Sequence, residues 1–129
     1  MPPAAGRARP LYIVDTDASV REGLARLAES AGFEPRPCQN IEDFLRRAEI
    51  GCGACALVDL SDAGLRQPVI HARLSVVATM LPVIALSAAD DARAERTADE
   101  LGARAFFRKP VDAAALLDSI GWATRKNIR

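Results

Sequence analysis

Residues 54–59 read Ala-Cys-Ala-Leu-Val-Asp, an uninterrupted apolar run that ends in an acid. Apolar residues without polar alternation indicate a strand that is buried on both faces, as in a parallel sheet covered by helices on either side. Four other segments fit strands of the same sheet, namely residues 11–14, 33–38, 82–86 and 105–108. The fold class that this pattern predicts is α/β.

Helical periodicity fills the intervals between these strands. Ser19 and Glu22 have the spacing of a capping box at a helix start, and apolar residues recur at helical intervals until Gly32 ends the pattern. Further helices are expected after Asn40, over residues 65–79 (with Val69, Ile70, Leu74 and Val77 at helical spacing), from Asp90 or Asp91 to Leu101, and after Asp112.

The alternation of strands and helices predicts one parallel sheet with helices on both faces. Pro35 and Pro37 cannot donate to a ladder, so residues 33–38 should form an edge strand. An edge position for the second strand suits the order 2-1-3-4-5 of a flavodoxin-like, doubly wound, five-stranded sheet with five helices. A TIM barrel needs about 250 residues, and this chain has 129.

Length and composition indicate an ordinary globular domain. The 17 basic residues balance the 17 acidic ones, so no electrostatic footprint for nucleic acid is present, and no apolar run approaches the roughly 20 residues that span a membrane. We expect a disordered lead-in over residues 1–10, one domain over 11–125 and a short tail over 126–129. An odd number of cysteines argues against a disulfide framework and favours a cytoplasmic location.

Cys52 and Cys55 form a CxxC pair, which invites a zinc or redox interpretation. A structural zinc site needs about four ligands. No second pair is present, and His71, the only histidine, has no ligand spacing to the cysteines. Small residues buried in and beside a strand are the preferred interpretation.

Four polar residues come at the carboxyl ends of four expected strands: Asp15, Asp59, Ser87 and Lys109. In open α/β sheets this edge is where ligands bind. Carboxylates there can hold a divalent cation, and an ionised carboxylate can attack phosphorus. The ammonium of Lys109 and the hydroxyl of Ser87 could contact the incoming phosphoryl oxygens. Each residue alone fits a helix cap or a solvated strand end, but the four together favour a site.

The loop after the first strand argues against a nucleotide-binding protein. It reads Asp15-Thr16-Asp17-Ala18-Ser19 and contains neither the GxGxxG nor the Walker A pattern. Without glycines the backbone cannot approach a pyrophosphate closely. A small flavin-binding carrier on this fold is a third hypothesis, which the absence of a Ser/Thr/Gly-rich phosphate loop disfavours.

The chain resembles the receiver domains of two-component response regulators, CheY-like and FixJ-like, over residues 11–122. Four segments carry this resemblance. The matching segments are residues 12–21 (YIVDTDASVR), 57–60 (LVDL), 82–88 (PVIALSA) and 108–110 (RKP). The resemblance implies that Asp59 is the phosphoacceptor and that Asp15 is an acid beside a magnesium ion. It also implies that Ser87 and Lys109 contact the phosphoryl group.

The resemblance has two further implications and two departures. Pro110 is usually preceded by a cis peptide bond in the family, and Phe106 lies where an aromatic side chain rotates inward in the active state; a core phenylalanine is the alternative interpretation. Thr16 replaces the second of two adjacent acids, which is normally a metal ligand, and the next acid is Asp17. The loop after Asp59 also lacks the usual Met-Pro.

These departures bear on the magnesium site. The backbone carbonyl of Ser61 could still serve as a ligand, because that contact does not depend on the side chain. Loss of one carboxylate leaves three outcomes: Asp17 swings in, water replaces the ligand, or magnesium binds weakly.

The expected function is therefore that of a switch rather than of an enzyme. Asp59 would accept a phosphoryl group from a histidine kinase or phosphotransfer protein, and the modified domain would change its affinity for a downstream protein or for a second copy of itself. The alternative is a degenerate pseudo-receiver that binds partners without phosphorylation. Neither reading involves a membrane, or nucleic acid bound by this domain alone.

Overall fold

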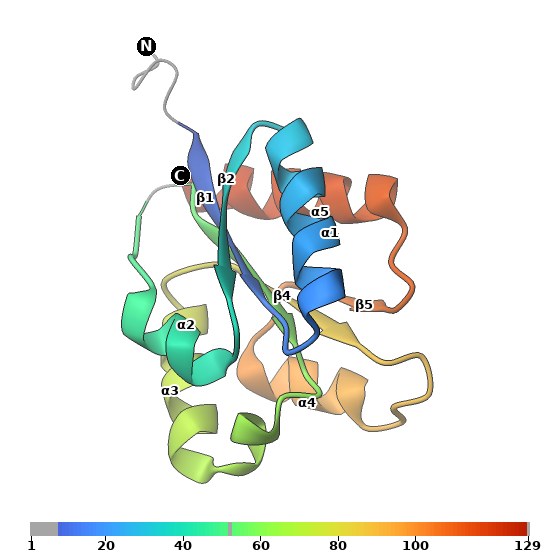
Figure 1. Ribbon diagram of the computed structural model, residues 1–129. Helices are drawn as coiled ribbons and strands as arrows, with labels where there is room; N and C mark the ends of the chain where they lie inside the picture. Colours follow the sequence, from blue (N-terminus) through green and yellow to red (C-terminus); the bar gives the residue numbers. More distant parts are fainter. Residues whose placement is uncertain (1–7, 52, 129) are drawn as a thin grey trace.

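The structure, a computed structural model, describes residues 8–51 and 53–128. Within them, strands and helices alternate along the chain (Figure 1). The strands are β1 (Arg9–Val14), β2 (Phe33–Cys38), β3 (Cys55–Asp59), β4 (Val83–Ser87) and β5 (Ala105–Arg108). The helices are α1 (Ala18–Ser30), α2 (Ile41–Arg47), α3 (Pro68–Ala78), α4 (Ala94–Leu101) and α5 (Ala113–Ile128), with a 3₁₀ helix η1 at Ala63–Arg66.

The five strands form one parallel sheet in the order β2-β1-β3-β4-β5. The expected flavodoxin-like order is therefore confirmed. β2 lies at the edge, where Pro35 pairs with Leu11 and Pro37 with Ile13. An edge tolerates these prolines because one side of the strand needs no hydrogen-bond donors.

Two apolar cores lie on opposite faces of the sheet. On one face, α1 and α5 cover the odd-numbered side chains of β1 and β3, with Ala28, Leu116 and Ile120 buried against Leu57. On the other face, α2, α3 and α4 cover the even-numbered side chains of β1 and β3, among them Tyr12. Because the central strands are buried on both sides, they read as continuous apolar runs in the sequence.

Several element boundaries differ from the sequence-based expectation. β1 begins at Arg9, so Arg9 and Pro10 belong to the sheet, and α5 continues to Ile128. The other expected lead-in residues up to 7, and residue 129 of the tail, lie outside the described part of the chain. The expected helix over 65–79 is η1 followed by α3, because Pro68 at the first position of α3 starts a new helix.

The start of α1 corrects the capping-box prediction. Asp17, rather than Ser19, is the N-cap: its Oδ1 accepts the N–H groups of Ser19 at 2.8 Å and Val20 at 3.2 Å. Either Asp or Ser can cap a helix, and the earlier residue satisfies the first free amides of α1. One carboxylate oxygen of Asp17 is consequently engaged at the helix start.

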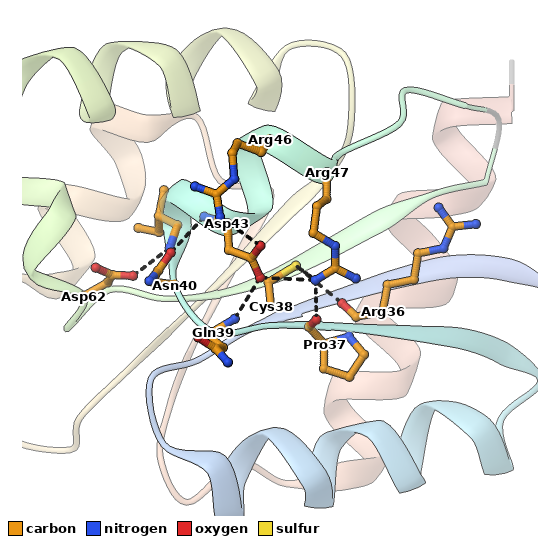
Figure 2. A network of polar contacts seen from close by, with 10 residues as sticks. Arg36, Pro37, Cys38, Gln39, Asn40, Asp43, Arg46, Arg47 and Asp62 are labelled. Atoms are coloured by element: carbon orange, nitrogen blue, oxygen red, sulfur yellow. Dashed lines mark hydrogen bonds and ion pairs between the residues drawn. The ribbon is translucent and has the colours of Figure 1, made fainter.

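Polar contacts fix α2 at both ends (Figure 2). At its start, Asn40 accepts the Asp43 N–H at 2.8 Å, and the buried Asp62 of the β3–α3 loop accepts the Ile41 N–H at 2.8 Å. At its end, Arg47 donates to the Pro37 carbonyl at 2.8 Å and to Asp43 at 3.1 Å. The short α2 is thus tied to β2 and to the loop that follows Asp59.

The structure bears on two expectations from composition. In the described part of the chain no helix combines the length and apolar character needed to cross a membrane. Cys55 is fully buried in β3, and burial raises its pKa to about 12. Cys52 lies outside the described residues. A buried Cys55 agrees with a packing role for this side chain.

Candidate functional site

The carboxyl ends of β1, β3 and β5 bring three charged side chains into contact. The Nζ atom of Lys109, which follows β5, lies 2.8 Å from Asp15 Oδ2 and 3.7 Å from Asp59 Oδ1. Both carboxylates are almost completely buried, at 2% exposure, whereas the Lys109 side chain is 25% exposed. A buried carboxylate pair is costly unless a cation compensates it, and Lys109 supplies that cation.

Asp15 is positioned by the turn between β1 and α1. Its Oδ1 accepts the Asp17 N–H at 2.9 Å, and its backbone carbonyl accepts a hydrogen bond from Arg21 of α1 at 2.7 Å. Thr16 lies between the two acids and is exposed. The carboxylate of Asp15 therefore points toward Lys109, while that of Asp17 is held at the start of α1.

Asp59 is held by the residue two places later. Ser61 donates its N–H to Asp59 Oδ1 at 3.2 Å and its hydroxyl to Oδ2 at 2.7 Å. Sequence reasoning assigned only the Ser61 carbonyl to the site and missed the side chain. The Asp-x-Ser spacing allows a local turn closed by the Ser61 N–H, but it does not fix the direction of the Ser61 hydroxyl.

Ser87 ends β4 and is fully buried. Its hydroxyl donates to the Ala88 carbonyl at 3.0 Å, and its own carbonyl accepts the Lys109 N–H at 2.8 Å. Strand pairing thus places Ser87 beside the backbone of Lys109. The Lys109–Pro110 peptide bond is cis, as the resemblance implied.

Phe106 in β5 is half-buried and packs against the core beneath α4. The guanidinium carbon of Arg108 lies 5.1 Å from the centre of its ring, within the range of a cation–π contact. Arg108 also donates to the Asp91 carbonyl at 2.8 Å in the loop before α4. Sequence reasoning missed Arg108, whose contacts join Phe106 to the β4–α4 loop.

An apolar groove of about 600 Å³ opens beside Lys109. Its walls are Val20, Gly23 and Leu24 of α1, Leu86, Ala88 and Ala89 at the end of β4, and Pro110 and Val111 after β5. The charged cluster therefore lies at the border of an apolar groove.

The donor atoms around Asp15 and Asp59 fit a magnesium ion only in part. Two carboxylates and the Ser61 carbonyl are hard oxygen ligands, and magnesium commonly keeps several waters beside one or two carboxylates. Among residues 8–51 and 53–128, however, no group of three His, Cys, Asp or Glu side chains could hold a metal ion. The residues present therefore offer two carboxylates and one carbonyl to such an ion, and water would have to complete its coordination.

Comparisons with known proteins agree with this geometry. The family model described as the response regulator receiver domain matches residues 11–121. The transcriptional regulatory protein TdiR of Thauera aromatica is 33% identical over 95% of this chain and 54% of its own length. The transcriptional regulatory protein FixJ of Azorhizobium caulinodans is 28% identical over 86% of this chain and 53% of its own length.

Among solved structures, the response regulator StyR superposes with a TM-score of 0.75 at 30% identity, covering 94% of this chain and 61% of that one. The chain therefore belongs to the response regulator receiver family and is a receiver domain of two-component signalling. It spans about half the length of the curated regulators TdiR and FixJ.

Proposed function

We propose that this receiver domain accepts a phosphoryl group on Asp59. The observation that carries the proposal is the cluster in which the Lys109 ammonium lies between Asp15, at 2.8 Å, and Asp59, at 3.7 Å. We assign Asp59 as the nucleophile for two reasons. It ends β3, the central strand of the sheet, and one of its contacts comes from the Ser61 side chain, which can rotate away.

The phosphoryl donor is a phosphohistidine of a kinase or phosphotransfer protein. One Asp59 oxygen attacks phosphorus, a P–O bond forms, the P–N bond breaks, and the imidazole nitrogen leaves with its electron pair and takes a proton from solvent. For this step the Ser61 hydroxyl must release Oδ2. Lys109 is close enough to shift from its two carboxylates onto the transferred phosphoryl oxygens.

Asp15, Asp59 and the Ser61 carbonyl would hold a magnesium ion. When bound, magnesium would neutralise charge on the phosphoryl oxygens during transfer. Asp17 is unsuited to replace the acid missing at Thr16, because one of its carboxylate oxygens caps α1. We therefore expect weak magnesium binding.

Phosphorylation would act on partners through the β4–α4 loop. The Ser87 hydroxyl, which donates to Ala88 in this structure, would turn to a phosphoryl oxygen. Phe106 and Arg108 touch the same region, since Arg108 donates to the Asp91 carbonyl. Rearrangement of this loop would change the surface at α4 that meets a downstream protein.

The test is incubation with acetyl phosphate and magnesium, followed by intact mass measurement. We expect the mass to increase by one phosphoryl group. Asp59→Asn should abolish this increase. The control Asp118→Asn, a change at an exposed position on α5, should retain it. No mass gain at any magnesium concentration would remove the proposal.

The alternative to this proposal is a pseudo-receiver that binds partners without phosphorylation. Its motive is Thr16, which stands where an acid is expected. Magnesium titration separates the two candidates. Saturable shifts of the Asp15 and Asp59 amide resonances support phosphorylation chemistry, and their absence supports the pseudo-receiver.

A further inference from the structure

Helix α3 is apolar on its outer side as well as on its inner side. Ile70, Leu74 and Ala78 face the core, as amphipathic packing requires. Val69 is nevertheless 66% exposed and Val76 58% exposed, and Met80, just beyond the helix end, is 46% exposed. A surface helix normally carries polar residues on its outer face, so α3 departs from the usual pattern.

The exposed apolar residues and one arginine are aligned. Val69, Arg73 and Val76 are spaced by four and three residues, which places them along one side of α3, and Met80 follows four residues later, just beyond the helix end. We call these four residues the α3 stripe. The same spacing is what a helix presents when it packs against another helix.

The α3 stripe borders a cleft between two helices. α2 and α3 pack side by side (Figure 1), and a cleft of about 200 Å³ between them is lined by Glu42, Leu45, Arg46, Ile70 and Arg73. Arg73 belongs to both the cleft and the stripe. The exposed valines therefore adjoin a cleft whose floor includes the partly buried Leu45 and the buried Ile70, and we call the combined surface the α2–α3 face.

The charges on this face indicate what could cover it. Arg73 is exposed within the apolar stripe, and no ion pair to it is found within the described part of the chain. Arg46 projects at the rim with 71% of its side chain exposed, bound to Asp43 (Figure 2). Glu42 is the single acid lining the cleft. An occupant must therefore offer apolar side chains together with carboxylates.

A second copy of the chain fits this face poorly. If two α3 helices paired antiparallel about a two-fold axis with their stripes in register, the axis would pass between Arg73 and Val76. Arg73 of each copy would then pack against Val76 of the other copy and would have no acidic residue of the stripe beside it. A charge placed against an apolar side chain is unfavourable, whereas a carboxylate at that place would form an ion pair.

We propose that the α2–α3 face is a docking surface for an amphipathic helix of a partner protein, with apolar residues at helical spacing flanked by Asp or Glu. Val69, Val76 and Met80 would pack against its apolar side, and Arg73 and Arg46 would pair with its acids. The surface is separate from the apolar groove beside Lys109, so the partner can bind without covering Asp59.

The experiment uses a designed 18-residue helical peptide with leucines at helical spacing and glutamates on both flanks. Its counterpart carries lysine in place of every glutamate. Binding is followed by amide chemical shifts of the ¹⁵N-labelled chain. We expect the acidic peptide to shift resonances of α2 and α3 and the basic peptide to bind at least about tenfold more weakly.

Two variants and one control sharpen the test. Arg73→Glu should weaken the acidic peptide about tenfold and strengthen the basic one, and Val76→Asp should remove binding of both. Arg96→Glu, the same change at another exposed arginine, on α4, should leave binding unchanged. Thermal melts followed by circular dichroism check that each variant is folded.

Three outcomes would overturn the proposal. The first is no saturable shift on the α2–α3 face at millimolar peptide, and the second is equal binding of the acidic and basic peptides. The third is sedimentation that shows a dimer which Val76→Asp dissociates, since this would assign the face to a second copy. A reversal of peptide preference by Arg73→Glu would establish the charge complementarity directly.

Discussion

At the scale of single residues, the hydroxyl of Ser61 has the clearest consequence. It donates to Asp59 Oδ2 at 2.7 Å while the Ser61 N–H donates to Oδ1. A hydrogen bond to a carboxylate stabilises its ionised, unmodified form and reduces its nucleophilicity. The side chain therefore competes with the incoming phosphoryl group.

We predict that Ser61→Ala accelerates phosphorylation of Asp59 by acetyl phosphate roughly fivefold, the equivalent of about 1 kcal/mol for one hydrogen bond. Time courses of intact mass measure this rate. Ser61→Thr, which keeps the hydroxyl, is the matched control and should retain a rate near that of the unmodified chain. An unchanged or slower rate in Ser61→Ala would show that the hydroxyl does not restrain Asp59.

The residues of the site could be predicted because strand ends are fixed by topology. Once the order of five parallel strands is inferred, Asp15, Asp59 and Lys109 must meet at one edge. The direction of each side chain could not be inferred in the same way. Whether Ser61 turns toward Asp59, and whether Asp17 or Ser19 caps α1, depends on rotamers that are selected by the folded surroundings.

At the scale of secondary structure, α2 depends on a carboxylate with a shifted pKa. Burial raises the pKa of Asp43, but the Gln39 N–H and the Arg47 guanidinium lower it more, so that it lies below the usual value of 3.8. A group whose pKa is lower in the folded state contributes stability above its unfolded pKa. That contribution is lost as the pH falls through the folded pKa.

We predict that Asp43→Asn lowers the free energy of unfolding by about 1 kcal/mol at pH 7. The difference from the unmodified chain should stay constant down to about pH 5 and shrink below pH 4. Urea titrations at several pH values measure it. Glu42→Gln, an exposed change on the same turn, is the control and should have a smaller effect. A difference that does not depend on pH would contradict the role of the carboxylate charge.

Element positions were predictable where the sequence carries a strong local signal. β2 and β5 have the expected bounds, and Asn40 and Asp112 cap the helices that follow them. The interval 65–79 was less well predicted, because an apolar pattern does not distinguish η1 plus α3 from one longer helix. It also did not reveal that Val69 faces solvent, since a helix with apolar residues on most sides has no unique inward face.

At the scale of the whole molecule, the two cores share one sheet. β1 and β3 contribute alternate side chains to both cores, so neither core can form without the strands that complete the other. A domain built in this way should unfold cooperatively, as small single domains usually do.

We predict one unfolding transition in urea, with a slope of about 1–2 kcal/mol per molar denaturant. Trp122 fluorescence follows α5, on one face of the sheet, and far-ultraviolet circular dichroism follows all the helices. The two curves should coincide. A fluorescence transition at lower urea than the circular dichroism transition would show that α5 separates before the rest of the domain.

The net charge of the chain does not show how its charged residues are distributed on the folded surface. Equal numbers of acidic and basic residues describe the chain as neutral, yet Arg73 stands exposed within an apolar stripe and Lys109 lies between two buried acids. Local potential depends on which side chains the fold gathers, and only the three-dimensional arrangement gives that information.

The prolines of β2 also restrict how this domain can associate with other chains. A sheet edge normally offers a row of backbone donors onto which a foreign strand can add, as in β-augmentation and edge-to-edge aggregation. Pro35 and Pro37 interrupt the donor row at alternate positions of that edge. A foreign strand added at this edge would lack hydrogen bonds from these two positions, which disfavours partners that bind by extending the sheet beyond β2.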